Sequence, residues 1–402
     1  MTTTTSAPTL TPALPRGARR VLALLGHLQH GSLDLQTPDG ELLHFGDTSQ
    51  PRAALRILDW AVCDAALKSG DVGFAESFVA GHWTTPDLRA LLELFIRNRT
   101  TLETVFYGGF WGGLLHRVRH LLNRNTRAGS RKNIHAHYDL GNDFYKLWLD
   151  PTMNYSSAWF AGAPEGALDA GQQAKMRRAL AEAGVTAGSR VLEIGCGWGA
   201  VAEVAARDFA ARLTGVTLST EQLTWAQQRL AAAGLGADLR LQDYRDIADE
   251  PFDAIVSIEM FEAVGREYWD GYFRTVRDKL KPGGRACIQS ITIRDDLFDR
   301  YVRSTDFIQQ YIFPGGLLPS PSQFRAHAER AGLRVVNELA FGPDYAETLR
   351  RWREAFLRQE GPVRELGFDT RFLRLWEFYL AYCEAAFAAG NTDVMQFTLV
   401  RD

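Results

Sequence analysis

Three glycines at alternate positions follow an apolar run in the stretch VLEIGCGWGA, residues 191–200. Glycine lacks a Cβ, so a loop built on Gly195 and Gly197 can turn sharply and bring its amide groups close to a ligand. A helix predicted to begin near Trp198 would direct its positive N-terminal end toward the same ligand. The stretch therefore predicts a binding site for an anionic or zwitterionic small molecule, either a dinucleotide or S-adenosylmethionine (SAM).

Residues around the glycines favour SAM over a dinucleotide. Glu193 stands two residues before the first glycine, where a carboxylate can orient the loop and attract the ammonium group of SAM. The next predicted strand ends in GVTLS, residues 215–219, without the acid that typically binds the ribose of NAD, while Gln222 can reach ribose hydroxyls. After the third predicted strand, Tyr244 and Arg245 could flank an adenine ring.

Two carboxylates, Glu259 and Glu262, follow the fourth predicted strand and are three residues apart. On a helical turn they would lie near one face, where a carboxylate in an apolar environment can act as a base or hold one. Acids in the first turn of a helix also interact favourably with the helix dipole. We expect this structural role for Glu259 and a functional role for Glu262, which lies between Phe261 and Ala263.

Composition and spacing argue against several classes of function. His135 and His137 have no third ligand at suitable spacing, so we expect no metal. A formal net charge of −3 gives no overall attraction to nucleic acid. No uncharged apolar run approaches the roughly 20 residues that cross a bilayer. We therefore expect a cytoplasmic protein that is soluble or bound peripherally to a membrane.

The chain of 402 residues is long enough for two domains, each with its own core. We predict a disordered tail over 1–15, an α+β accessory domain over 16–103, a basic amphipathic linker over 104–132 and a SAM-binding catalytic domain over 133–402. Residues 104–138 contain no acid and six Lys or Arg, with apolar residues at helical spacing. Both a helix packed on its neighbours and a helix lying on a membrane surface fit that pattern.

Periodicity predicts the elements that would position these residues. Residues 32–46 alternate apolar and polar side chains around Pro-Asp-Gly, which predicts a hairpin, and helical spacing predicts helices over 52–68 and 86–98. From residue 190 onward, strands alternate with helices, which predicts an α/β fold with a mostly parallel, doubly wound sheet. The predicted strands are 190–194, 212–217, 237–241, 253–258, 285–291, 334–341 and 394–400, and the predicted helices are 198–208, 220–234, 266–280, 320–332, 346–358 and 368–388.

Seven sequence blocks share the pattern of one known family. They are HYDLGNDFYKLWLDPTMNYSSAWF (137–160), VLEIGCGWG (191–199), GVTLSTEQ (215–222), LQDYRD (241–246), MFEAVG (260–265), YIFPGGLLPS (311–320) and FGPDY (341–345). Together they resemble the cyclopropane-fatty-acid synthases, from about residue 131 to the C-terminus. The resemblance implies a class I SAM-dependent C-methyltransferase with a Rossmann-like, seven-stranded sheet. It would transfer a methylene group to the cis double bond of an unsaturated phospholipid acyl chain and form a cyclopropane through a carbocation.

The resemblance also implies which residues bind the two small molecules. A bound bicarbonate ion would be the base that removes a proton from the transferred methyl group. Of the family's bicarbonate-binding residues, the Glu, Tyr and Ile correspond to Glu262, Tyr345 and Ile291 of this chain. The family's His and Cys are replaced here by Gln289 and Ser157. Gln289 can still donate a hydrogen bond, and Ser157 keeps its backbone amide. For SAM, the implied residues are Tyr155, Ser156, Gly195, Gly197, Thr217, Leu218, Gln222, Tyr244, Arg245, Ile258 and Glu259, with the last two contributing backbone atoms, besides Glu193 from the reasoning above.

Other outcomes fit the same pattern. Loss of a different proton from the carbocation would give a methylene- or methyl-branched chain, and a lipid-binding homologue without catalysis is a further alternative. The implied partners are unsaturated phospholipid acyl chains at the inner face of a membrane, and a homodimer is compatible with the pattern. With such a substrate, the basic segment 104–132 becomes a candidate docking surface.

Overall fold

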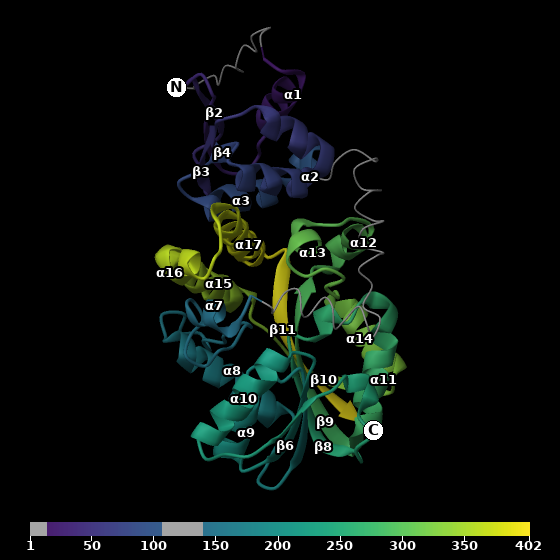
Figure 1. The fold of residues 1–402 in the computed structure, drawn as a ribbon. Helices are drawn as coiled ribbons and strands as arrows, with labels where there is room; N and C mark the ends of the chain where they lie inside the picture. Colours follow the sequence, from purple (N-terminus) through teal and green to yellow (C-terminus); the bar gives the residue numbers. More distant parts are fainter. Residues whose placement is uncertain (1–13, 107–139) are drawn as a thin grey trace.

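The computed structural model describes residues 14–106 and 140–402, which contain two β-sheets (Figure 1). The N-terminal sheet has the order β2-β1-β3-β4 and consists of β1 (Ser32–Gln36), β2 (Leu42–Gly46), β3 (Arg52–Ile57) and β4 (Trp83–Thr84). The larger sheet has the order β10-β11-β9-β8-β5-β6-β7 and consists of β5 (Arg190–Ile194), β6 (Arg212–Thr217), β7 (Asp238–Leu241), β8 (Phe252–Ile258), β9 (Leu280–Ile293), β10 (Leu333–Ala340) and β11 (Thr392–Arg401). The predicted α/β class with a seven-stranded sheet and a smaller α+β N-terminal part is confirmed.

The larger sheet is parallel except at one edge, where β11 runs antiparallel to both β9 and β10. Strand β5 pairs in parallel with β6 on one side and with β8 on the other, so the strand order reverses at β5. The loops that follow these three strands open at the same edge of the sheet. In open α/β sheets, ligands bind at this edge, next to the point of reversal.

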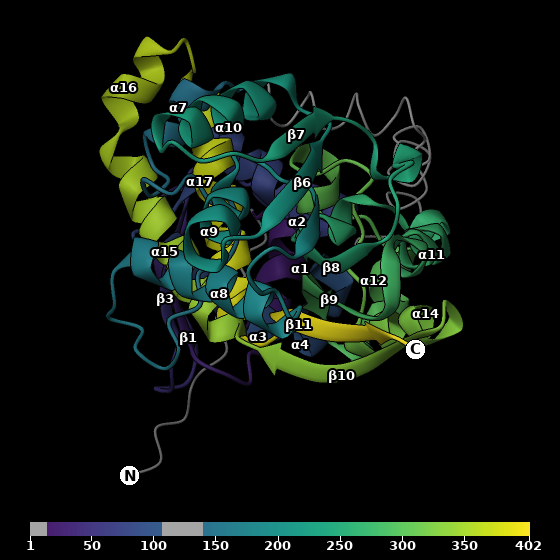
Figure 2. The same cartoon turned by 90° about the horizontal axis from the view of Figure 1, so that it is seen from below.

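Helices cover both faces of the larger sheet (Figure 2). Because β5 is covered on both sides, its residues are buried in alternation against two cores: Leu192 and Ile194 face one, and Val191 faces the other. The helices over Val191 are α8 (Leu168–Glu182), α9 (Ala200–Phe209) and α10 (Thr220–Ala232), and those over Leu192 are α11 (Trp269–Lys279) and α14 (Pro321–Arg330). All seven predicted strands and all six predicted helices of this part are found, with β9 beginning earlier, at Leu280.

The N-terminal part matches the prediction at the hairpin and differs after it. Strands β1 and β2 pair antiparallel across the predicted turn. The prediction of a helix over 52–68 is wrong at its start, because residues 52–57 form β3, which pairs in parallel with β1. Ala53, Leu55 and Ile57 are buried at alternate positions, a period of two that we read as part of a helical pattern. The helices of this part are α1 (Arg16–Leu25), α2 (Ala61–Ala80), α3 (Leu88–Arg97) and α4 (Arg99–Phe106).

The N-terminal part packs on the C-terminal helix α17 (Thr370–Ala388), which in turn packs on α15 (Gly342–Arg358) (Figure 1). One apolar cluster joins residues of α2 and α3 to residues of both helices. A polar contact reinforces the junction, since the buried carboxylate of Asp71 on α2 accepts hydrogen bonds from the Tyr382 hydroxyl at 2.9 Å and the Phe307 amide at 3.2 Å. The remaining helices are α7 (Asn142–Lys146), α12 (Asp295–Arg303), α13 (Phe307–Tyr311) and α16 (Glu360–Glu365).

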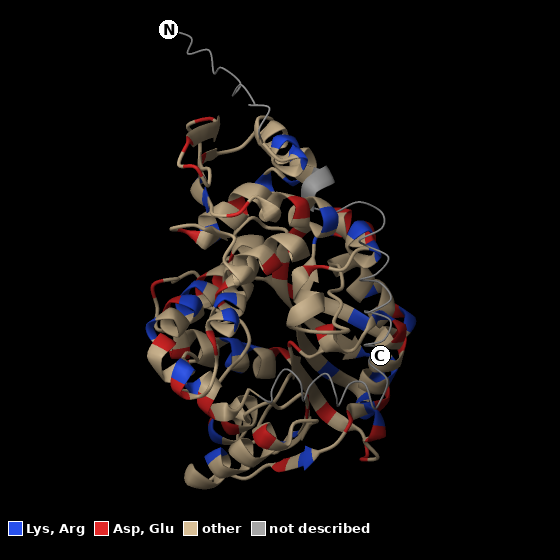
Figure 3. Ribbon diagram, turned by 45° about the horizontal axis from the view of Figure 1, so that its top comes forward, with Lys and Arg blue, Asp and Glu red and all other residues tan. Residues whose placement is uncertain are grey.

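Several predictions concern residues outside the described ranges. The basic segment 104–132, apart from the end of α4, lies there, as do His135 and His137 and nearly all of the tail over 1–15. The domain boundaries therefore stay predictions. Within the described ranges, no helix combines the length and apolarity that crossing a membrane requires. Basic and acidic side chains are intermixed over the described helices and strands (Figure 3).

The turn from β5 into α9 depends on glycines. Gly195, Gly197 and Gly199 have φ values of +88°, +49° and +82°, which side chains with a Cβ rarely adopt. A Cβ on Gly199 would lie 2.8 Å from the Cβ of Ala226 on α10. Helix α9 begins at Ala200, slightly later than predicted, and its first turn faces the open edge of the sheet.

We expect Gly199→Ala to destabilise the protein by about 2 kcal/mol, because it combines an unfavourable φ with a steric clash. Gly188→Ala is the matched control, since Gly188 has a φ of +81° but a Cβ added there would have no atom within 4 Å. Urea denaturation measures the free energy of unfolding, and we expect the control variant to lose less of it, about 1 kcal/mol. Equal losses would contradict the importance of the close α9–α10 packing.

Candidate active site

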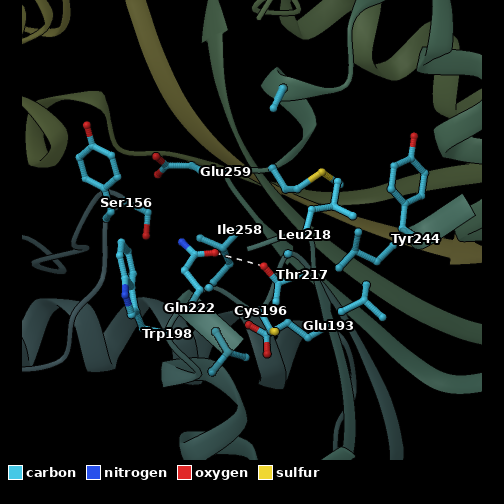
Figure 4. A pocket seen from close by; sticks show the side chains of 18 of the residues that line it. Ser156, Glu193, Cys196, Trp198, Thr217, Leu218, Gln222, Tyr244, Ile258 and Glu259 are labelled. Atoms are coloured by element: carbon cyan, nitrogen blue, oxygen red, sulfur yellow. Dashed lines mark hydrogen bonds between the residues drawn. The ribbon is translucent and has the colours of Figure 1, made fainter. Parts of the chain in front are cut away.

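One cavity lies at the carboxyl ends of β5, β6, β7 and β8, where the topology places a ligand (Figure 4). Its walls come from the glycine loop, from the loops after β6, β7 and β8, and from residues 153–156, which precede α8 in the chain. Every residue predicted to bind SAM lines this cavity: Tyr155, Ser156, Glu193, Gly195, Gly197, Thr217, Leu218, Gln222, Tyr244, Arg245, Ile258 and Glu259. The structure therefore brings together segments that are up to about a hundred residues apart in the chain.

Glu193 is a buried acid in the cavity wall. It is 3% exposed, and its Oε2 has no hydrogen-bond partner. Burial raises the pKa of Glu193 to about 8, because no neighbouring cation or donor compensates for the loss of water. A cationic group of a ligand placed beside this carboxyl would supply that compensation. The arrangement fits an ammonium group, as the sequence predicts.

Polar contacts hold the other cavity residues in place. The Thr217 hydroxyl donates to Gln222 Oε1 at 3.1 Å (Figure 4), and Ser219 caps α10 by accepting a hydrogen bond from the Gln222 amide. After β7, buried Asp243 accepts hydrogen bonds from Arg245 Nε at 2.8 Å and from Arg245 Nη2 at 2.5 Å. The Arg245 guanidinium also lies 5.7 Å from the centre of the Tyr244 ring. These contacts orient both residues predicted to flank an adenine.

Glu259 lies in a different local structure from the one we expect from the sequence. It lies between β8 and the short 3₁₀ helix Phe261–Ala263, with a φ of +50°, rather than in the first turn of a helix. Its carboxylate accepts hydrogen bonds from the Ser157 amide at 2.9 Å, Gln289 Nε2 at 2.7 Å and the Tyr345 hydroxyl at 2.7 Å. The expected position of Glu259 in the first turn of a helix is therefore wrong, and its carboxylate is instead the point where these three donors converge.

Glu262 forms the second member of a carboxylate pair. Its Oε1 accepts a hydrogen bond from the Ile291 amide on β9, and its buried Oε2 has no hydrogen-bond partner. Burial, and then the charge of Glu259, raise the pKa of Glu262 to about 8. Burial also raises the pKa of Glu259, against the opposing effects of Lys175 and the hydrogen bonds. Two neighbouring carboxylates that resist ionisation together can share one proton.

Sequence reasoning missed a row of polar residues behind this pair. Gln396 on β11 lies opposite Gln289 on β9 in the strand register, and its Nε2 donates to Gln289 Oε1 at 3.0 Å. Arg178 on α8 donates to Gln396 Oε1 at 2.5 Å. This chain of contacts fixes the Gln289 amide so that its nitrogen faces Glu259. The only sequence signal is a polar residue inside an otherwise apolar predicted strand.

Lys175 on α8 was also missed. Its side chain is fully buried, and its ammonium group donates a hydrogen bond to the hydroxyl of Ser156 in the cavity wall. Burial lowers the pKa of Lys175 to about 8, while the charges of Glu259 and Asp150 oppose that shift. A buried lysine is uncommon, and here it supplies a positive charge close to the carboxylate pair. On the same helix, Gln172 Nε2 donates to the Ser156 carbonyl at 2.9 Å.

The structure brings together the residues predicted to bind bicarbonate. Their hydrogen-bond donors, however, already donate to the side chains of Glu259 and Glu262. Ser157, Gln289 and Tyr345 donate to Glu259, and the Ile291 amide donates to Glu262. The predicted fifth residue, Glu262, is itself one of the acceptors. The site as folded therefore does not fit a separate bicarbonate ion.

Aromatic rings gather around Tyr155, which lines the cofactor cavity together with Glu259. The hydroxyl groups of Tyr155 and Tyr379 are 2.7 Å apart, and the Phe313 ring centre lies 6.4 Å and 6.2 Å from the ring centres of these two tyrosines. Tyr345, which donates to Glu259, packs against Phe387 with the ring centres 4.4 Å apart. Electron-rich ring faces at such a position can stabilise a positive charge.

The strand order, the glycine loop and the cavity at the carboxyl ends of the strands define a class I methyltransferase fold. Residues 125–397 match the family model described as mycolic acid cyclopropane synthetase. The chain belongs to this family, which confirms the resemblance found in the sequence.

Two named relatives align over most of the chain. A tuberculostearic acid methyltransferase of Mycobacterium tuberculosis (strain ATCC 25618 / H37Rv) is 40% identical over 384 residues, covering 93% of this chain and 88% of the relative. A cyclopropane-fatty-acyl-phospholipid synthase of Escherichia coli (strain K12) is 33% identical over 379 residues, covering 92% of this chain and 96% of the relative. A solved mycolic acid cyclopropane synthase complexed with SAH and CTAB has a TM-score of 0.63 at 33% identity, covering 67% of this chain and 98% of that one.

The buried carboxyl of Glu193 predicts a pH-dependent stability. The folded protein keeps the proton up to about pH 8, whereas the unfolded chain releases it near the ordinary value of 4.5. This contribution to stability is therefore complete below that ordinary value and is lost as the pH rises toward 8. We expect the free energy of unfolding to fall between these limits by up to about 1.4 kcal/mol per pH unit more in the wild type than in Glu193→Gln.

Chemical denaturation over that pH range measures the difference. Glu165→Gln is the control, because Glu165 is exposed on the loop before α8, and we expect it to keep the slope of the wild type. Equal slopes for the wild type and Glu193→Gln would show that Glu193 is ionised in the folded protein.

Proposed function

We propose that this protein transfers a methylene group from SAM to the cis double bond of an unsaturated phospholipid acyl chain and forms a cyclopropane. The observation that carries the proposal is the position of the carboxylate pair. Glu259 belongs to the wall of the cavity formed by the glycine loop and also accepts hydrogen bonds from Gln289 and Tyr345. A cofactor cavity and a group able to take up a proton therefore adjoin each other.

SAM as the cofactor is supported by the cavity and by the solved relative that is complexed with SAH. The unpartnered carboxyl oxygen of Glu193 fits the ammonium group, Gln222 fits the ribose, and Tyr244 with Arg245 fits the adenine. Bound SAM would supply an electrophilic methyl group on its sulfonium sulfur.

The reaction requires positioning more than activation of the substrate. An alkene is a weak nucleophile without a proton to lose beforehand, so the protein must align it with the methyl group and exclude water. Transfer of the methyl group leaves a positive charge on the acyl chain. The ring of Tyr155 belongs to the same cavity wall as Glu259, with Phe313 and Tyr379 beside it, and these rings are suited to stabilise that charge. Removal of a proton from the new methyl group by the carboxylate pair would then close the ring.

A second product is favoured by one specific observation, the 40% identity to a protein named as a tuberculostearic acid methyltransferase. If a hydride first shifts from the methylated carbon to the neighbouring cationic carbon, the positive charge moves to the carbon that bears the new methyl group. Loss of a proton from that methyl group then gives a methylene-branched chain. Reduction by another enzyme would convert it into a methyl branch. For either product, we propose that the protein reaches its substrate from the cytoplasmic face of the membrane.

Product analysis tests both alternatives. We expect purified protein, SAM and vesicles of a cis-monounsaturated phospholipid to give acyl chains heavier by one CH₂, and vesicles of a saturated phospholipid to give none. Proton NMR separates the products, because a cyclopropane has characteristic upfield ring protons and a methylene branch has olefinic ones. No gain in mass would refute methyl transfer to the chain.

We expect Glu262→Gln to lower turnover by about 100-fold without weakening SAM binding. Glutamine can still accept the hydrogen bond from Ile291, but it cannot share a proton with Glu259. Glu262 is also absent from the residues that line the cofactor cavity. Calorimetric titration with SAM and mass spectrometry of the lipid product measure the two effects, and unchanged turnover would exclude Glu262 from the proton transfer.

A further inference from the structure

The donors that the family resemblance assigns to bicarbonate are directed at a side chain of the protein itself. The Ser157 amide, Gln289 Nε2 and the Tyr345 hydroxyl lie 2.9, 2.7 and 2.7 Å from the carboxylate oxygens of Glu259. A carboxylate and a bicarbonate ion both present two acceptor oxygens on one planar carbon. Glu259 therefore satisfies these donors in the way that a bound ion would.

The surroundings of Glu259 require an acceptor at this position. Gln396 donates to Gln289 Oε1, so the Gln289 amide can only donate toward Glu259. The Tyr345 hydroxyl keeps its proton, because burial holds its pKa well above the usual range. The positive charge of buried Lys175 also favours an anion here. An empty position would leave buried donors without partners, which costs roughly 1–3 kcal/mol for each.

The backbone shows that Glu259 is held in place by these contacts. Its φ of +50° costs a side chain with a Cβ about 1 kcal/mol, whereas glycine adopts this conformation without strain. The hydrogen bonds from Ser157, Gln289 and Tyr345 offset that cost. Glycine at this position would therefore fit the backbone and open a space lined by unpartnered donors.

We propose that Glu259 takes the place of bicarbonate as a built-in base, so that turnover needs no bicarbonate. The inference rests on the proposed methyl transfer, and Glu259 is placed for the task because it also lines the cofactor cavity. After methyl transfer, a Glu259 oxygen accepts a proton from the new methyl group. The electron pair of that C–H bond forms the last C–C bond of the ring and neutralises the cationic carbon. Glu259 becomes a carboxylic acid and returns the proton to water once the product has left.

The first test compares the wild type with Glu259→Gly in buffer freed of carbon dioxide, with and without added sodium bicarbonate. We expect the rate of the wild type to be the same in both buffers. Without bicarbonate, we expect Glu259→Gly to lose about 100-fold in rate, and bicarbonate to restore at least about 10-fold of that loss. Ala210→Gly is the matched control, because Ala210 also has a positive φ, of +49°, but lies on the surface at the end of α9.

A second measurement does not depend on turnover. The line width of ¹³C-labelled bicarbonate in NMR reports binding of the ion to the protein. We expect saturable broadening with Glu259→Gly and none with the wild type or with Ala210→Gly. Glu259→Gln keeps the length of the side chain but cannot take up the proton. We expect it to be inactive and not to be rescued by bicarbonate.

The outcomes separate this inference from the proposed function. A wild type that binds labelled bicarbonate, or slows when bicarbonate is removed, would overturn the inference while leaving methyl transfer intact. Full activity of Glu259→Gly without bicarbonate would overturn it too, as would a loss of activity accompanied by neither rescue nor ion binding. If no lipid product forms under any condition, the proposed function fails, and the NMR measurement still decides whether Glu259 occupies an anion site.

Discussion

The structure depends on compensating one buried carboxylate, that of Glu259, beside the cofactor cavity. A carboxylate removed from water must be compensated by donors or cations, and Glu259 draws its donors from separate parts of the chain. Ser157 comes from the segment before α8, Gln289 from β9 and Tyr345 from α15. Each donor must lie within hydrogen-bond distance of the Glu259 carboxylate. The positions of β9, of α15 and of the segment before α8 are therefore constrained by this one group.

The antiparallel edge of the sheet follows from the same constraint. Strand β11 inserts between β9 and β10, which places Gln396 opposite Gln289 and within reach of Arg178 on α8. Gln396 and Arg178 do not line the cavity, yet they decide which end of the Gln289 amide faces Glu259. Helix α15 carries Tyr345 and packs on α17, which also contacts α2 and α3 of the N-terminal part.

The sequence was sufficient for the sheet and the cofactor cavity, because both rest on local signals. Apolar runs of strand length and glycines with φ near +88° are dictated by short segments, so VLEIGCGWGA located the loop after β5 correctly. The role of Glu259 was not predictable in this way. Its donors come from residues about 30 to 100 positions away, and its backbone leaves the helical region that acids in a first helical turn would adopt. The prediction of a helix over residues 52–57 was wrong for a related reason. These residues form a strand because they pair with β1, which is distant in the sequence.

A base attached to the chain has consequences that a free ion does not. Bicarbonate can shift or rotate within its site, whereas Glu259 is fixed by its backbone and by donors on three sides. In the proposed mechanism, the seating of the acyl chain rather than the base would then decide whether the ring closes directly or a hydride shifts first. The ring of Tyr155 lines the cavity with Glu259, and the rings of Phe313 and Tyr379 lie beside it, so in this mechanism the chain would be seated against these rings. Under the proposed mechanism, ring closure and branching would differ in whether a hydride shift precedes the loss of a proton from the new methyl group, with the same carboxylate accepting that proton in both cases.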